Sequence, residues 1–182
     1  MRIIAGSWRG RRLRAPAGTG VRPTLGRVCQ AIFDLPLVKP DDALVLDLYA
    51  GSGALGIEAL SRGARRVVFV EKDRRAAEVV RRNLETLLVE PGRARVLVQP
   101  VEQALAHLEE SFQLVLADPP YRLGLGPAVL DEVRRHPRLL AEGGVVLVQT
   151  EPGALPADEH GGLACVFRRK WGETEVTIWR QA

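Results

Sequence analysis

The chain has 182 residues, of which 46% are hydrophobic and 26% are charged, a composition typical of a single globular domain with its own core. No apolar run is long enough to cross a bilayer, because the longest, such as residues 143–150, has the length of a strand. The two cysteines and three histidines are too scattered to predict a disulfide or a metal site. We therefore expect a cytoplasmic, monomeric protein without a metal or a membrane contact.

The charge is unevenly distributed along the chain. Residues 1–39 hold eight basic side chains and one acid, a formal balance of +7, whereas the whole chain carries +4 and the remaining 143 residues therefore carry −3. Neutralising phosphates with basic side chains releases counterions and favours binding, so this asymmetry predicts nucleic acid as the partner of the basic end. The alternative is a solvated basic surface that has no partner.

The first 23 residues are expected to form an extension. Residues 1–16 predict two short strands joined through Gly6 to Gly10, and a Pro/Gly-rich linker follows. Thr24 can cap a helix that ends near Leu35, because Pro36 cannot continue it. We place the boundary of the main domain, residues 24–182, at this cap.

Short apolar segments and amphipathic segments then alternate. We expect strands at 43–48, 66–71, 94–98, 112–117 and 144–149, with helices at 53–62, 74–88, 101–109 and 126–136. This alternation predicts an α/β fold with a mostly parallel sheet covered by helices on both faces. Residues 164–179 differ, because they predict two antiparallel strands around a turn at Gly172 and Glu173 that extend the edge of the sheet.

A glycine-rich segment follows the first strand of this alternation. Gly51-x-Gly53-x-x-Gly56 has the spacing of a nucleotide-binding turn, and Glu71, 20 positions beyond Gly51, ends the next strand, where a carboxylate can accept both hydroxyls of a ribose. Asp47 would add negative charge near a bound pyrophosphate, whereas the sulfonium and ammonium groups of S-adenosylmethionine favour a carboxylate. The pattern therefore favours S-adenosylmethionine over NAD.

The segment Asp118-Pro119-Pro120-Tyr121 ends the fourth strand of the alternation. The two prolines fix the backbone and leave its carbonyls free to accept hydrogen bonds, so the loop can hold a substrate rigidly for group transfer. Asp118 and the Pro119 carbonyl can accept hydrogen bonds from an amino group, and Tyr121 can stack on a planar base. An ionised Asp118 only accepts, which suits the adjacent N1–H and N2 donors of guanine better than adenine.

Together these residues resemble the methyltransferases that carry an (Asn/Asp)-Pro-Pro-(Tyr/Phe) motif. More closely, "MRIIAGSWRGRRL", "RPT", "DLYAGSGALGIEALSRGA", "VEKD", "LADPPY" and "KWGETEV" resemble the bacterial 16S ribosomal RNA (guanine-N2)-methyltransferases over nearly the whole chain. The resemblance implies a Rossmann-like class I methyltransferase fold, S-adenosylmethionine as methyl donor and a guanine of small-subunit RNA, free or in an assembling particle, as acceptor.

The resemblance also implies three sets of site residues. The catalytic set is Asp118, Pro119, Pro120 and Tyr121. The donor would be bound by Asp47, Tyr49, Ala50, Gly51, Ser52, Gly53, Glu71, Lys72, Val101, Glu102 and Asp118. RNA would be contacted by Arg9, Arg11, Arg12, Arg22, Thr24 and Arg27.

Several other functions share parts of this pattern. An adenine-N6 methyltransferase of DNA or RNA would use both loops, although a DNA enzyme should carry a target-recognition insertion for which 182 residues leave little room. A protein-glutamine methyltransferase would favour Asn in place of Asp118 and would not need the basic end. An NAD-dependent oxidoreductase would place the negative charge of Asp47 near a pyrophosphate, and a non-catalytic RNA-binding module would leave Asp118 and Glu71 without a role.

Overall fold

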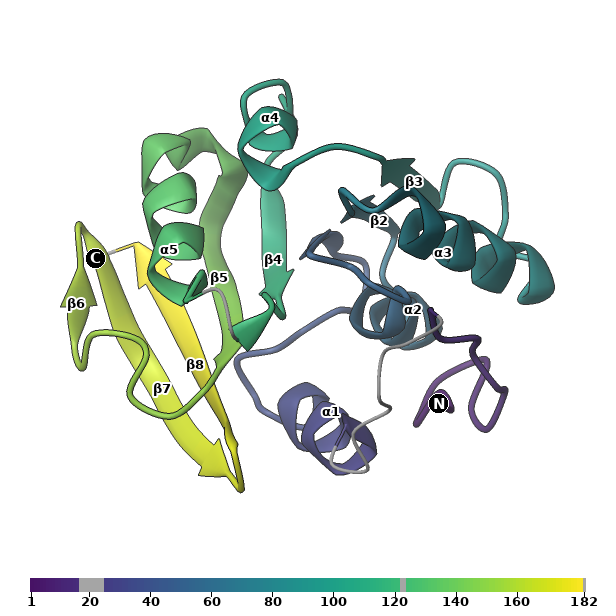
Figure 1. Cartoon of the computed structure of the whole chain (residues 1–182), viewed down its shortest axis with the longest axis horizontal. Coiled ribbons are helices and arrows are strands. Elements are labelled where there is room, and N and C mark those ends of the chain that lie inside the picture. Colours follow the sequence, from purple (N-terminus) through teal and green to yellow (C-terminus); the bar gives the residue numbers. More distant parts are fainter. Residues whose placement is uncertain (17–24, 122–123, 182) are drawn as a thin grey trace.

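The computed structural model describes residues 1–16, 25–121 and 124–181. Its centre is one sheet of eight strands in the order β3-β2-β1-β4-β5-β8-β7-β6 (Figure 1). The strands are β1 (Leu44–Leu48), β2 (Arg66–Val70), β3 (Ala94–Leu97), β4 (Phe112–Ala117), β5 (Leu140–Thr150), β6 (Glu159–His160), β7 (Leu163–Trp171) and β8 (Thr174–Gln181). The helices are α1 (Leu25–Phe33), α2 (Ala54–Ser61), α3 (Arg74–Thr86), α4 (Val101–Leu105) and α5 (Gly126–Arg135), with a 3-10 turn at Pro137–Leu139.

The first five strands are parallel, as the alternation predicts. β1 pairs with β2 on one side and β4 on the other, β3 extends the sheet beyond β2, and β5 extends it beyond β4. Strand order therefore reverses direction at β1 and β4, whose neighbouring carboxyl ends leave a crevice where ligands bind in open sheets of this type.

The end of the chain forms the predicted antiparallel strands. β8 pairs antiparallel with β5, and β7 pairs antiparallel with β8. β7 ends at Trp171 and β8 begins at Thr174, so Gly172 and Glu173 form the turn, and Gly172 has the positive φ of 61° that such a turn requires. The sequence did not predict β6, a two-residue strand that pairs with the start of β7.

Helices cover both faces of the sheet. α1, α2 and α3 pack on one face, where Val45, Phe69 and Leu116 point, and α4 and α5 pack on the other, where Leu46 and Val115 point. Alternate residues of each central strand thus enter opposite cores, which explains why these strands are mostly apolar on both faces.

The N-terminal segment differs from the two predicted strands. Residues 1–13 do turn back in a hairpin, but the only bridge assigned within the described part is Arg2 with Arg12. Its backbone hydrogen-bonds to itself, for example from the Ile3 N–H to the Arg11 carbonyl and from the Leu13 N–H to the Met1 carbonyl, both at 3.0 Å, but residues between the two arms bind the body of the protein. Ile4 and Ala5 donate backbone N–H bonds of 2.8 and 3.0 Å to the two carboxylate oxygens of Glu58, and Trp8 donates one of 3.0 Å to Ser61.

Two element boundaries differ from the prediction by four residues. β5 begins at Leu140 instead of residue 144, and its pairing with β4 shifts register between Phe112 and Leu114, which admits the extra residues. α4 ends at Leu105, four residues early, because its buried positions end there, with Val101, Ala104 and Leu105 facing the core. None of the helices described here is long and apolar enough to span a bilayer.

Candidate functional site

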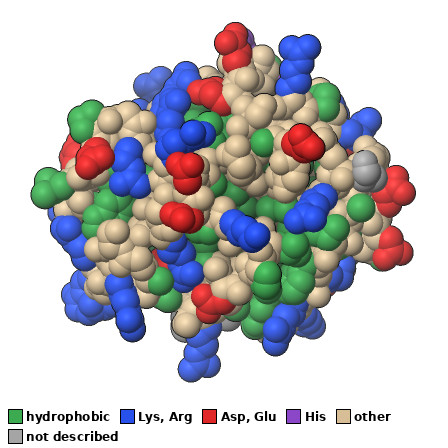
Figure 2. Space-filling model, turned by 180° about the vertical axis from the view of Figure 1, so that it is seen from behind, with side chains coloured by type: hydrophobic (Ala, Val, Ile, Leu, Met, Phe, Trp, Pro, Cys, Tyr) green, Lys and Arg blue, Asp and Glu red, His purple; other side chains and the backbone are tan. Residues whose placement is uncertain are grey.

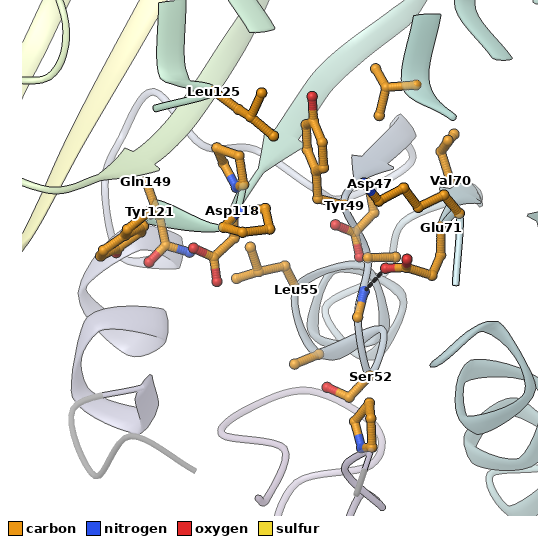
Figure 3. A pocket seen from close by; sticks show the side chains of 18 of the residues that line it. Asp47, Tyr49, Ser52, Leu55, Val70, Glu71, Asp118, Tyr121, Leu125 and Gln149 are labelled. Carbon is orange, nitrogen blue, oxygen red and sulfur yellow. Dashed lines mark hydrogen bonds between the residues drawn. The ribbon is translucent and has the colours of Figure 1, made fainter. Parts of the chain in front are cut away.

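A cavity of about 680 Å³ opens at the carboxyl ends of β1, β2, β4 and β5. Figure 3 shows Glu71 on one side of it and Asp118 with Tyr121 on the other, with Asp47 between them. The cavity is lined by Met1, Ala15, Pro16, Val28, Asp47, Tyr49, Ala50, Gly51, Ser52, Ala54, Leu55, Val70, Glu71, Lys72, Pro100, Val101, Glu102, Asp118, Pro119, Pro120, Tyr121, Leu125, Gln149 and Thr174. Both sequence-predicted loops therefore face one space.

The three glycines of the first loop have different structural roles. Gly51 has a φ of 57° and lines the cavity, and a Cβ built on it would meet no atom closer than the Tyr49 carbonyl oxygen at 3.9 Å. A Cβ on Gly53 would instead contact Val80 at 3.1 Å, and one on Gly56 would overlap Phe69 at 2.3 Å. Gly51 thus keeps the cavity open, whereas the other two let the loop and α2 pack against the core. Gly53, although predicted to bind the donor, does not line the cavity.

Glu71 ties this loop to the end of β2. One carboxylate oxygen accepts the backbone N–H of Gly51 at 2.8 Å, drawn as a dashed line in Figure 3, and the other accepts that of Asp73 at 2.8 Å. Each oxygen can accept a second hydrogen bond, so the carboxylate can still bind a ribose. Asp73, not Glu71, caps α3 by accepting the Ala76 N–H.

Asp47 is buried at the floor of the cavity. Its side chain is 2% exposed and accepts the backbone N–H of Gly56 at 2.9 Å. Burial raises the pKa of Asp47 well above its usual range; the Gly56 hydrogen bond opposes this shift, and the negative charges of Asp118 and Glu71 add to it. The ionised form of Asp47 is therefore electrostatically unfavourable by itself, and it becomes favourable when a cation lies beside it.

The wall opposite Glu71 is built from the Asp-Pro-Pro-Tyr loop. Pro119 is buried, and the Tyr121 hydroxyl donates to the Thr174 hydroxyl of β8 at 3.2 Å, which fixes the ring. Figure 3 shows the side chain of Gln149, the penultimate residue of β5, pointing toward Asp118. Gln149 is 5% exposed and lines the cavity.

Several lining residues were not predicted. Gln149 could have been found, since it is a polar residue in the otherwise apolar run "VVLVQ" at a strand's carboxyl end. Thr174 carries no such signal, because only the antiparallel pairing of β8 with β5 brings it to the cavity. The same holds for Met1, Ala15 and Pro16, which reach the cavity through the docking of the N-terminal segment.

The remaining predicted donor residues lie around the cavity. Tyr49 has a φ of 57°, an unusual backbone conformation for a residue with a side chain, and burial raises its pKa, as do the charges of Glu102 and Glu132. Ala50 and Ser52 belong to the glycine loop and line the cavity. Lys72 is exposed at its rim, and Val101 and Glu102 begin α4 on the far wall.

Those predicted RNA-contacting residues that the structure describes do not line the cavity. Arg9, Arg11, Arg12 and Arg27 are exposed, whereas Arg22 and Thr24 lie outside the described residues. Arg11 donates to the Thr86 carbonyl at the end of α3 at 2.6 Å, where a cation is favoured by the helix dipole. Within the described ranges, no group of three or more His, Cys, Asp or Glu side chains could hold a metal ion.

Comparison with known proteins gives a consistent family. The family model described as "Conserved hypothetical protein 95" matches residues 1–180. The chain is 38% identical to ribosomal RNA small subunit methyltransferase D of Escherichia coli K12 over 151 residues, covering 83% of this chain and 75% of that protein. It is also 38% identical to YlbH of Bacillus subtilis strain 168, covering 100% of this chain and 99% of that protein.

Solved structures agree with this result. The Escherichia coli protein yhhF superposes with a TM-score of 0.85 at 33% identity, covering 100% of this chain and 97% of that chain. A ribosomal protein L11 methylase from Lactobacillus delbrueckii, at 17% identity and a TM-score of 0.68, shares the fold alone. With a family match over nearly its whole length and a cavity formed by the two motif loops, the chain is a class I methyltransferase and belongs to the ribosomal RNA small subunit methyltransferase D family.

Proposed function

We propose that this protein transfers a methyl group from S-adenosylmethionine to the exocyclic N2 of a guanine in 16S ribosomal RNA, in the cytoplasm, during assembly of the small subunit. The observation that carries this proposal is that both motif loops line the same cavity, in which the Gly51–Glu71 side and the Asp118–Tyr121 side face each other. The enzyme would act as a monomer, since one chain supplies both sides of the cavity.

The residues present fit the methyl donor. Glu71 can accept the ribose hydroxyls, and Gly51 lets the ligand approach the backbone. The positive groups of the donor would offset the burial and the negative charges that raise the pKa of Asp47. Val101 and Glu102 at the far wall would contact the adenine ring. When bound, S-adenosylmethionine supplies an electrophilic methyl group, whose bond to sulfur breaks as the new N–C bond forms.

The acceptor side would hold a base that has left its helix. Tyr121, fixed by Thr174, stacks on the base, and Asp118 with the Pro119 carbonyl accepts the hydrogens of the exocyclic amine. This arrangement turns the nitrogen lone pair toward the methyl group. As the N–C bond forms the amine becomes acidic, and Asp118 or solvent takes its proton.

The basic N-terminal segment would position the RNA. Arg9, Arg12 and Arg27 have exposed side chains that can reach phosphates, whereas Arg11 would have to share its guanidinium with the Thr86 carbonyl. Arg22 and Thr24, which lie between these elements in sequence, complete the proposed contact set.

The test is to identify the methylated product. The enzyme and labelled S-adenosylmethionine are incubated separately with four samples: small ribosomal subunits that lack this modification, the RNA from such subunits, DNA, and protein. The nucleosides of each sample are then separated. We expect label in small-subunit RNA as N2-methylguanosine. Label in N6-methyladenosine, in DNA or in protein would overturn the proposal.

A pair of glycine variants links the product to the cavity. Gly51→Val should abolish donor binding, because the new side chain projects into the cavity and not into the protein. Gly92→Val is the control, since Gly92 also has a positive φ, of 87°, with no atom within 4 Å of an added Cβ, but it does not line the cavity.

A further inference from the structure

The turn between β7 and β8 carries a cluster of basic and aromatic side chains that the proposed function has not used. We define residues 168–175 as the hairpin tip. Arg169 and Lys170 are exposed, and Trp171 is partly buried against the core on the α1 face. The Arg169 guanidinium lies over the Trp171 ring, 5.1 Å from its centroid.

The charges of the hairpin tip are not equivalent. Arg168 forms an ion pair with the buried Glu175 at 2.5 Å and donates to the Pro156 carbonyl, so it holds the hairpin against the loop after β5. Arg169 and Lys170 form no ion pair with an acid among the residues that the structure describes. These two cations therefore remain available to an external anion.

The hairpin tip lies beside the acceptor side of the cavity. Trp171 pairs in register with Thr174, and Thr174 both lines the cavity and accepts the Tyr121 hydroxyl. In Figure 1 the tip and the N-terminal segment lie on opposite sides of the lower end of the molecule, with α1 between them. Figure 2 shows Lys and Arg side chains along much of the lower outline from behind.

We propose that the hairpin tip is a second RNA-binding surface, which holds the nucleotides next to the target base on the side of the cavity opposite the N-terminal segment. Arg169 and Lys170 bind phosphates, and the stacked Arg169–Trp171 pair offers a planar platform to an unpaired base. Two basic surfaces on either side of the cavity would hold the strand at both ends of the extruded nucleotide. This inference rests on the proposed RNA substrate.

Binding of small-subunit RNA at several salt concentrations tests this inference. The double variant Arg169→Ala with Lys170→Ala should bind RNA more weakly, and its log–log salt slope should fall by about 0.7 for each phosphate that the variant no longer binds. Its affinity for S-adenosylmethionine should stay within about twofold of wild type, because neither side chain lines the cavity. If the alanine pair lowers the melting temperature, Arg169→Gln with Lys170→Gln takes its place.

The matched control removes the same charge elsewhere. Arg65 and Arg138 are exposed arginines just before β2 and β5, at the opposite end of the sheet from the cavity, and neither forms an ion pair with an acid among the described residues. Arg65→Ala with Arg138→Ala should change RNA affinity much less than the tip variant. Equal effects of the two variants would show only a general charge effect and would overturn the inference.

Variants of Trp171 test the contribution of stacking separately from that of charge. Trp171→Leu keeps an apolar side chain against the core but removes the platform, and it should weaken RNA binding about fivefold or more, whereas Trp171→Phe should lose less. Equal binding by wild type and Trp171→Leu would remove the platform from the inference. If wild type binds RNA but transfers no methyl group to it, the proposed function fails, and the binding comparison still decides the role of the hairpin tip.

Discussion

Asp47 shows how one residue can oppose folding and favour binding. Its carboxylate is buried, accepts one backbone hydrogen bond and lies near the charges of Asp118 and Glu71. These conditions raise the pKa of Asp47, so ionising it in the folded protein costs stability. A cationic ligand reverses this cost, because it favours the ionised carboxylate.

The variant Asp47→Asn should separate these two effects. An unfolded Asp ionises near pH 3.8 but the folded carboxyl keeps its proton to higher pH, so the wild type loses stability as the pH rises from 3.8 through the raised pKa. Asn cannot ionise and can still accept the Gly56 N–H, so the variant should unfold at higher urea concentration at pH 7 to 8, with a smaller advantage near pH 4.

Donor binding should change in the opposite direction. A hydrogen bond to a charged group contributes about 1.5–3 kcal/mol, so Asp47→Asn should weaken S-adenosylmethionine binding about tenfold or more in calorimetry. Wild-type affinity should rise with pH as Asp47 ionises, by at most about tenfold per pH unit for one linked proton. A pH-independent affinity, or a variant that binds as tightly as wild type, would place Asp47 away from the donor's positive groups.

Residue chemistry was only partly predictable from the sequence. The position of Asp47 before the glycine loop indicated a donor-facing carboxylate, but its burial depends on α2 and could not be read from spacing. The functions of Gly51 and Gly53 also look alike in sequence, although only Gly51 lines the cavity. Close packing against Val80 decides the role of Gly53, and such contacts are not local in sequence.

At the scale of elements, the N-terminal segment is joined to the donor loop through Asn83 of α3. Asn83 is 2% exposed; its side-chain oxygen accepts the Arg14 N–H at 2.9 Å, and its nitrogen donates to the carbonyls of Arg14 at 3.1 Å and Ser52 at 3.0 Å. One buried side chain thus binds both the segment that carries the arginines and the loop that lines the cavity. The segment is part of the wall of the site.

Asn83→Ala should therefore destabilise the protein and loosen this wall. Each buried polar group left without a partner costs about 1–3 kcal/mol, so urea unfolding should show a loss of at least about 1 kcal/mol. Hydrogen exchange of the Arg14 amide should become faster. The control is Thr86→Ala on the same helix, where the exposed hydroxyl only donates to the Arg82 carbonyl. Equal stability losses in the two variants would contradict a specific role of Asn83.

This junction explains the limit of prediction at the element scale. The alternation of apolar segments predicted the order and type of the elements from β1 to β5, because each period is set by local geometry. It could not predict that Glu58 and Ser61, which look like ordinary helix residues, bind the backbone of residues 4–8. Those hydrogen bonds join positions 53 or 54 residues apart, beyond the reach of any local pattern.

At the scale of the whole molecule, the sheet brings the two motifs together. The glycine loop and the Asp-Pro-Pro-Tyr loop are 67 residues apart from Gly51 to Asp118, yet β1 and β4 are neighbours, so both loops leave the same edge of the sheet. The antiparallel strands add Thr174 and the hairpin tip to this edge. Fold topology therefore accounts for a cavity with a donor side and an acceptor side.

The central claim is that the acceptor side holds guanine through the carboxylate of Asp118, and single-turnover methylation by Asp118→Asn tests it most directly. The variant keeps the size of the side chain but replaces a carboxylate oxygen, which accepts hydrogen bonds, with an NH2 group that would face the N–H groups of guanine. Losing this hydrogen bond costs about 1–3 kcal/mol, or more where a charge is involved. With unmodified small-subunit RNA and saturating S-adenosylmethionine, we predict a transfer rate about tenfold or more below wild type. A transfer rate within about twofold of wild type would contradict the account, because Asp118 would then not hold the base.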